Sequence, residues 1–199
     1  MSDVLDYYVS AASPFVHLGH AAFCELVQSR RVPVALKPID LGRVFPVSGG
    51  LPLKQRAPQR QAYRLVELRR WSLHRGVPLN LHPKHFPVAG DLSACWLLAA
   101  AENDVSDGLR LLGAIGRALW AEDCNVADPA TLRALAGGLG LDVERLAERA
   151  AAPDTRTHYD TLTQEAIDRG IFGVPTYVLN GEMFWGQDRL DFLARALAQ

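Results

Sequence analysis

The first candidate for chemistry is Ser13, a hydroxyl that follows a predicted buried strand, Val4 to Val9, and precedes Pro14. Serine is a preferred helix N-cap and proline a preferred first helical residue, so the pair predicts that a helix begins here. Ligands of βα units bind beyond the carboxyl end of the strand, where the next helix presents free backbone amides. Ser13 is therefore placed to stabilise an anion, and the alternative role is that of an ordinary cap.

A second candidate is the segment Phe172-Gly173-Val174-Pro175-Thr176, in which a proline opens a predicted strand. Proline at the first residue of a strand leaves neighbouring backbone groups unpaired and available to an extended peptide. The simpler interpretation is a strand that happens to begin with proline.

His17 lies one helical turn beyond Ser13, where its imidazole could contact a substrate phenol or act as a base. His17, His20 and Cys24 share one helix face, but a single helix supplies no second ligand segment, and we expect no metal site. The three cysteines show no CxxC or zinc-like spacing, which predicts free thiols in a reducing, cytoplasmic compartment.

The elements that position these residues begin with a βαβ unit. Val4 to Val9 is rich in β-branched and aromatic residues and predicts a strand, Phe15 to Arg30 has helical periodicity, and Val32 to Ile39 suits a second strand. Such a unit requires a parallel pair of strands.

The middle of the chain is predicted to be helical throughout. Gly49-Gly50-Leu51-Pro52 is typical of a loop, and an amphipathic helix follows from Ala57 to Arg75 and ends at Gly76. Five further helices are predicted over Leu92 to Glu102, Asp107 to Glu122, Pro129 to Leu139, Asp142 to Ala152 and Thr155 to Arg169.

The last part of the chain returns to a period of two residues. Asn180-Gly181 favours a type I′ turn, which predicts that Thr176 to Leu179 and Glu182 to Trp185 pair as antiparallel strands. A last helix is predicted over Gln187 to Leu197.

This order, β-α-β, then helices, then α-β-β-α, predicts an α/β protein of thioredoxin-like fold with an all-helical insertion. The prediction assigns residues 1–76 and 171–199 to the thioredoxin-like domain and residues 77–170 to the helical insertion domain.

Composition excludes several classes of partner. The chain has 199 residues, 49% apolar and 22% charged, with a formal net charge of −1 and no charge blocks. No basic surface for nucleic acid or for an anionic membrane is expected. The longest apolar stretch, Cys95 to Ala101, is far shorter than the roughly 20 residues that span a bilayer.

Three segments carry a family resemblance: Ser13-Pro14-Phe15, Phe172-Gly173-Val174-Pro175-Thr176, and Phe184-Trp185-Gly186-Gln187-Asp188-Arg189. At this spacing they resemble the 2-hydroxychromene-2-carboxylate isomerase family, which is similar to kappa-class glutathione transferases and DsbA-type thioredoxin folds. The resemblance covers nearly the whole chain, including Pro58-x-Arg60-x-x-Tyr63. It implies a fold of the DsbA/kappa-class type, glutathione as cofactor, a small aromatic substrate and a homodimer.

The resemblance also implies residue roles. Ser13 would face the sulfur of glutathione, and Val174, before a Pro175 expected to be cis, would pair its backbone with the cysteine of the tripeptide. Gln187 and Asp188 would hold the γ-glutamyl end.

Three further positions complete the expected site. Arg60 stands where relatives carry a basic residue for glutathione, and a guanidinium there can pair with a carboxylate. His17 and Trp185 are the candidates for the aromatic substrate pocket.

The implied reaction is the cis–trans interconversion of 2-hydroxychromene-2-carboxylate and trans-o-hydroxybenzylidenepyruvate. A glutathione thiolate stabilised by Ser13 would add to the conjugated double bond, allow rotation and leave again. Lowering a thiol pKa of about 8.5 by about two units requires roughly 2.7 kcal/mol. A hydrogen bond to a charged group contributes about 1.5–3 kcal/mol and a helix N-terminus about 0.3–1 kcal/mol, so no metal or general base is required.

Alternatives remain open at this point. A disulfide oxidoreductase would need a thiol pair where the chain reads Ser13-Pro14-Phe15-Val16. A kappa-like glutathione transferase or peroxidase would use the same thiolate on another electrophile, and a non-catalytic glutathione- or peptide-binding module would need Ser13 only as a cap. Gly50 and Ala89-Gly90 stand where relatives often carry polar side chains, which can alter substrate choice or glutathione affinity.

Overall fold

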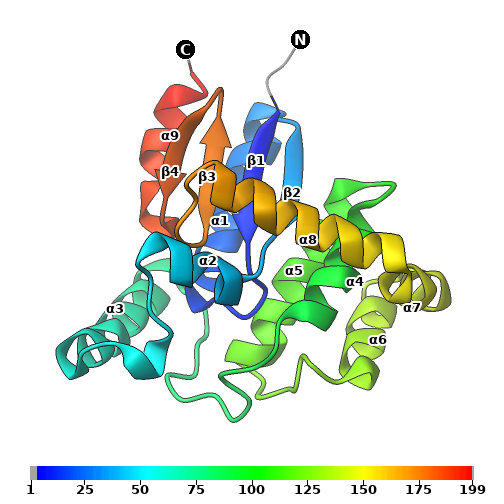
Figure 1. Ribbon diagram of the computed structural model, residues 1–199, viewed down its shortest axis with the longest axis horizontal. Helices are drawn as coiled ribbons and strands as arrows, with labels where there is room; N and C mark the ends of the chain where they lie inside the picture. The colour runs from blue at the N-terminus through cyan, green and yellow to red at the C-terminus, as the bar shows by residue number, and fades with distance from the viewer. Residues whose placement is uncertain (1–3, 199) are drawn as a thin grey trace.

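The computed structural model describes residues 4–198 (Figure 1). A four-stranded sheet has the order β2-β1-β3-β4. Its strands are β1 (Leu5–Val9), β2 (Val34–Pro38), β3 (Thr176–Leu179) and β4 (Glu182–Trp185). β1 and β2 are parallel, and β3 pairs antiparallel with β1 and with β4. The predicted βαβ unit and C-terminal hairpin are both confirmed.

Local sequence signals explain the start of the first helix and the turn of the hairpin. Ser13 caps α1 (Pro14–Arg30), its side chain accepting a hydrogen bond from the Val16 amide. In the hairpin turn, Asn180 has φ of 52° and Gly181 has φ of 86°, the left-handed conformation that a type I′ turn requires at both central residues.

The helix α2 (Leu41–Ser48) was not predicted from the sequence. Asp40 caps it by accepting a hydrogen bond from the Gly42 amide at 2.7 Å, and the helix packs against α8. Pro46 lies inside it, which is the residue type that argues against a helix at the level of sequence. Burial of Val44 and packing against a distant helix outweigh that local signal.

The remaining helices follow the predicted pattern, with ends shifted by no more than two residues. They are α3 (Pro58–Arg75), α4 (Asp91–Ala101), α5 (Val105–Trp120), α6 (Pro129–Gly138), α7 (Val143–Ala151) and α8 (Pro153–Asp168), with a 3₁₀ turn η1 (Leu53–Gln55) before α3. The single helix predicted over residues 187–197 was wrong: it is a 3₁₀ turn η2 (Gln187–Arg189) followed by α9 (Leu190–Ala196). Hydrogen bonds from Arg75 to the side chain and the backbone of Gln187 keep this first turn separate from α9.

The core joins the sheet to the helices around it. The rings of Tyr7, Phe23 and Tyr177 stack at 4.0–5.2 Å between β1, α1 and β3, and Trp120 is fully buried at the end of α5. Figure 1 shows α8 crossing the sheet and α4 to α7 gathered beyond β2. No helix within residues 4–198 is long and apolar enough to cross a bilayer.

The predicted domain boundaries fall between elements. The boundary at residues 76 and 77 follows α3, and the boundary at residues 170 and 171 precedes β3. Residues 1–3 and 199 of the predicted thioredoxin-like domain lie outside the described residues. The division into two domains stays a prediction.

Candidate active site

Strand pairing gathers the candidate residues at one end of the sheet. Tyr8, near the end of β1, pairs with Thr176, the first residue of β3, and Thr176 pairs with Trp185, the last residue of β4. The Gly186 amide donates to the Pro175 carbonyl at 2.9 Å. The turn before Ser13, the residues before β3 and the residues after β4 therefore meet at this end.

Ser13 holds its hydroxyl at the start of α1. Ser13 is only 8% exposed, and its Oγ accepts a hydrogen bond from the Val16 amide at 3.3 Å. The hydroxyl proton donates to no acceptor within residues 4–198. The first turn of α1 carries no acidic side chain, so the partial positive charge of the helix end is not offset locally. Capping therefore uses the oxygen of Ser13 and leaves its proton available to an anion.

Val174 presents an unpaired stretch of backbone. The Val174–Pro175 bond is cis, as predicted, and the side chain of Val174 is almost buried. In the described part of the chain neither its N–H nor its carbonyl forms a backbone hydrogen bond. Thr176 fixes the segment by donating from Oγ1 to the Gly173 carbonyl at 2.7 Å. A free donor and acceptor on a fixed segment are the groups that an extended peptide pairs with.

Gln187 is fixed by an arginine that the sequence analysis did not single out. Arg75, at the end of α3, donates from Nε to Gln187 Oε1 and from Nη2 to the Gln187 carbonyl, both at 2.7 Å. Gln187 is only 2% exposed, and a Cβ added to Gly19 of α1 would lie 2.5 Å from its Cβ. The Gln187 oxygens are therefore held by the protein. A basic residue in the last turn of a helix is common, so no local signal reveals this role of Arg75.

Asp188 and Arg60 remain accessible. Asp188 pairs with the neighbouring Arg189 at 2.6 Å while its side chain stays partly exposed at the start of η2. Arg60 is exposed in the first turn of α3, and its side chain makes no ion pair or hydrogen bond within residues 4–198. Both charges can take a ligand group without first breaking a buried interaction.

His17 and Trp185, predicted to share a substrate pocket, line different cavities. His17 lines a largely apolar groove of about 810 Å³ between α1 and α5, whose lining does not include Ser13. Its Nε2 donates to the Pro78 carbonyl at 3.0 Å, and Nδ1 faces Gly116. Burial lowers the pKa of this imidazole. The donated proton and the covered Nδ1 indicate a packing role within this structure.

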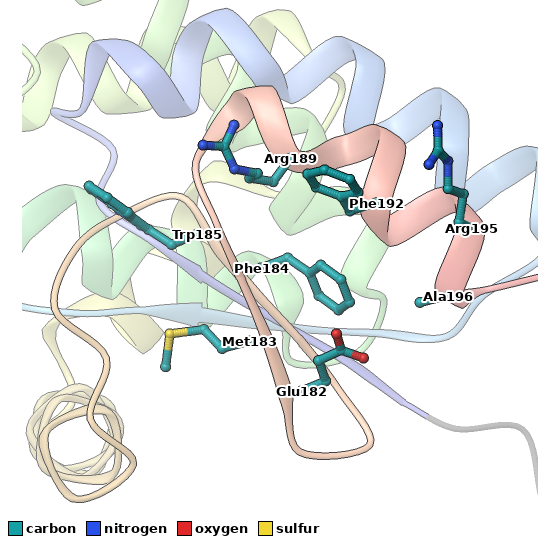
Figure 2. Close-up of a pocket in the computed structure, with 8 residues that line it drawn as sticks. All are labelled: Glu182, Met183, Phe184, Trp185, Arg189, Phe192, Arg195 and Ala196. Carbon is teal, nitrogen blue, oxygen red and sulfur yellow. The ribbon is translucent and has the colours of Figure 1, made fainter.

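Trp185 lines a different cavity, of about 390 Å³, between β4 and α9. Figure 2 shows Phe184 between β4 and α9, whereas the Trp185 side chain points away from α9 at the bend before η2. Its indole is 50% exposed, meets the Phe172 ring edge-on at 4.7 Å and covers Gly173. Trp185 thus borders the segment that ends in Val174.

The cysteines lie away from the Ser13 turn and carry no redox motif. Cys24 contacts the buried His20 at 3.5 Å, and burial raises the pKa of its thiol to about 11. Cys95 and Cys124 are free thiols in other elements. Within residues 4–198 no group of three or more histidine, cysteine or acidic side chains could hold a metal ion.

The two sequence departures have different surroundings. A Cβ added to Gly50 would lie 2.5 Å from the Phe45 ring, so an asparagine here would displace Phe45. Gly90 lies close to Ser10, since an added Cβ would be 3.9 Å from its Oγ. Ser10 in turn accepts the amide hydrogen bond of Ser13 at 2.9 Å.

Comparison with known proteins identifies the family. The model of the DSBA-like thioredoxin domain family matches residues 4–198. A 2-hydroxychromene-2-carboxylate isomerase of Pseudomonas putida is 30% identical over 98% of this chain and 95% of its own length. One of Sphingobium xenophagum is 28% identical over 97% of both chains.

Solved structures agree with these relatives. A 2-hydroxychromene-2-carboxylate isomerase structure superposes with a TM-score of 0.79 at 27% identity, covering 98% of this chain and 94% of the other. A putative protein disulfide isomerase from Nitrosomonas europaea shares the fold, with a TM-score of 0.76 at 17% identity over 100% and 96% of the two chains. The chain therefore belongs to the DsbA-like thioredoxin domain family and, within it, to the enzyme family of the 2-hydroxychromene-2-carboxylate isomerases.

Proposed function

We propose that this enzyme is a glutathione-dependent cis–trans isomerase of 2-hydroxychromene-2-carboxylate or a closely related aromatic enone. The observation that carries the proposal is the undonated hydroxyl proton of Ser13 at the start of α1. The names of the relatives support the choice of substrate.

The residues at this end of the sheet fit glutathione. The unpaired N–H and carbonyl of Val174 suit the backbone of its cysteine residue, since a tripeptide pairs as a short strand. Asp188, near a helix start, can accept its α-ammonium group, and Arg60 can pair with a carboxylate. Gln187 contributes by holding Asp188 in place, because its own oxygens are bonded to Arg75.

The chemistry that glutathione supplies when bound is a thiolate nucleophile for reversible addition to a conjugated double bond. Ser13 stabilises that charge by donating its hydroxyl proton while its oxygen accepts from the Val16 amide. Hydrogen bonds in series polarise one another, which strengthens the donation. One such bond contributes about 1.5–3 kcal/mol and the helix end about 0.3–1 kcal/mol, close to the roughly 2.7 kcal/mol that a two-unit pKa shift requires.

The proposal extends to the assembly and the compartment. We infer a homodimer in the cytoplasm, supported by the free thiols and by the exposed edge strand β4 with its half-exposed Trp185. Size-exclusion chromatography with light scattering tests the assembly, and a mass of one chain, 21.8 kDa, would contradict it.

The decisive experiment follows the ultraviolet spectrum of 2-hydroxychromene-2-carboxylate with the purified protein, with and without glutathione. We expect conversion only when both are present. Ser13→Gly should abolish most activity and Ser13→Thr should retain part of it, since threonine keeps the hydroxyl. Glycine is the matched choice because it replaces a serine N-cap at a cost of only a few tenths of a kcal/mol.

Ser29→Ala is the control, because the Ser29 hydroxyl donates to the Leu26 carbonyl at the far end of the same helix. Full activity of Ser13→Gly would refute the role of the hydroxyl. Glutathione binding without conversion would instead favour a kappa-like transferase or peroxidase, if other electrophiles react, or a non-catalytic module, if none does.

A further inference from the structure

Three arginines lie close to one another at the start of α3. Arg60 and Arg64 are spaced by four residues within the helix, the spacing that places side chains next to one another, and Arg56, which lies just before the helix, is close enough to both for their charges to interact. None of them forms an ion pair with a carboxylate within residues 4–198. Neighbouring like charges without counterions repel one another, which favours binding of an anion.

The three side chains differ in how far the protein already uses them. Arg56 donates from Nε to the Leu51 carbonyl at 2.8 Å and covers the Phe45 ring. Arg60 is exposed. Arg64 is half-buried, with its guanidinium 5.4 Å from the centre of the Phe86 ring and 5.8 Å from that of Trp120.

Arg64 is set apart because it is half-buried and still has no oxygen partner among the described residues. Its guanidinium donates no hydrogen bond to any residue in the described range 4–198, whereas the half-buried Arg75 donates to two oxygens and even the more exposed Arg169 donates to three. A guanidinium carries five N–H donors and is costly to remove from water without acceptors. Contact with the faces of two rings holds the guanidinium in place and leaves those donors to a ligand.

Two other features mark the same place as rich in donors and short of acceptors. Burial and the charge of Arg56 lower the pKa of Arg64 to about 10, so the cation is under-compensated here but still charged at neutral pH. The indole Nε1 of the buried Trp120, over which Arg64 stacks, also has no acceptor among the described residues.

This cluster lies beside the Ser13 end of the sheet. Phe86 is four residues before Gly90, which contacts Ser10 in the turn that leads to Ser13. Figure 1 shows α3, the connection that follows it and the end of α5 at the end of the molecule opposite the start of β1, where β1 gives way to α1. An anion held by Arg64 is therefore near the start of α1.

We propose that Arg64 binds the carboxylate of a planar aromatic acid, with the Phe86 and Trp120 rings holding its guanidinium in place. This site deepens the proposed function, on which it rests for the identity of the acid: the substrate carboxylate binds at Arg64 while Arg60 remains for glutathione. Arg64 is thus a substrate-binding residue that selects carboxylates over neutral analogues. A guanidinium matches a carboxylate with two parallel hydrogen bonds, which a lysine cannot reproduce.

The test uses an inert pair of ligands, chromone-2-carboxylate and chromone, and measures binding to the full chain by titration calorimetry. We expect the wild-type protein to bind the carboxylate at least tenfold more tightly than chromone. Arg64→Met, which keeps an unbranched apolar stem, should weaken chromone-2-carboxylate at least tenfold and leave chromone within about twofold. Arg64→Lys should fall between them.

Arg69→Met is the matched control, since Arg69 lies on the exposed side of α3 and makes no side-chain bond within residues 4–198. It should bind both ligands as the wild type does. Equal binding of the two ligands by the wild type, or unchanged carboxylate binding by Arg64→Met, would overturn the proposal. So would an equal loss of affinity for both ligands in Arg64→Met with an unchanged melting temperature, because Arg64 would then contribute to binding without distinguishing a carboxylate from a neutral ligand.

The binding test is independent of isomerase activity. If the Arg64 variants lose carboxylate selectivity while the wild-type protein fails to convert 2-hydroxychromene-2-carboxylate, the proposed function fails and the aromatic-acid site stands. If conversion is observed and Arg64→Met changes neither binding nor the KM for substrate, the isomerase stands and the site fails.

Discussion

Replacing Arg75 by methionine should destabilise the protein more than any exposed arginine replacement on the same helix. Arg75 joins α3 to η2 through two hydrogen bonds of 2.7 Å to Gln187, which is almost fully buried. Its guanidinium also lies 5.3 Å from the centre of the Trp71 ring, a contact that methionine retains only in part.

The magnitude follows from these bonds. A hydrogen bond from a charged donor contributes about 1.5–3 kcal/mol, and a buried acceptor left without a donor costs about 1–3 kcal/mol. Because Arg75 is only half-buried, water can reach part of the vacated space, so we expect a net loss of about 2–4 kcal/mol. For a chain of this size that corresponds to a melting temperature lower by roughly 5–15 °C.

The assay is urea unfolding followed by circular dichroism, with Arg70→Met as the control. Arg70 pairs with Glu67 at 3.4 Å on the exposed surface, and such pairs contribute about 0–1 kcal/mol. Hydrogen exchange should show faster opening of residues 186–189 in Arg75→Met, and the KM for glutathione should rise more than kcat falls. A loss no greater than that of Arg70→Met, with unchanged exchange at these residues, would refute this account of the bonds.

Three further predictions concern titration and packing. Burial lowers the pKa of His20 to about 4, so the unfolded chain takes up the proton first, and stability should fall as pH drops from about 6.5 to 4. The midpoint of urea unfolding should fall over this pH range in the wild-type protein and stay level in His20→Gln. Burial alone would raise the pKa of Glu165, but hydrogen bonds from two cations and a tyrosine lower it to about 2. The contribution of the Glu165 carboxylate to folding stability should therefore be lost as the pH falls from about 4.5 to 2. Acid unfolding of Glu165→Gln should be flatter over that range than that of the exposed control Glu148→Gln. Gly173→Ala would place a Cβ 2.6 Å from Nε1 of Trp185 and should therefore move the half-exposed indole. Tryptophan fluorescence should shift in this variant, and the same substitution in a Trp185→Phe background should cause no shift.

Much of the fold is encoded in short-range signals. Ser13 and Pro14 start α1 because a capping hydroxyl and a fixed φ satisfy local geometry without any distant partner. Asn180 and Gly181 form the hairpin turn because they tolerate positive φ, and this turn also sets the register that brings Trp185 opposite Thr176. The sequence thereby determined that Ser13 and the segment before β3 lie at one end of a sheet.

What only the tertiary structure decided depends on contacts between elements far apart in the chain. The helix α2 forms against α8 despite Pro46, and the turn at Gln187 stays separate from α9 because Arg75 holds it from α3. The same cause separates His17 from Trp185, since helix packing turns His17 toward Pro78 and α5.

The arginines of α3 illustrate the limit most directly. In the sequence Arg60 and Arg64 look alike, each one turn from another arginine. Only the fold stacks Arg64 on rings from the connection after α3 and from the end of α5, and leaves Arg60 exposed. Local patterns specify which residue types can bind an anion, whereas burial and the absence of an acceptor are properties of three-dimensional packing.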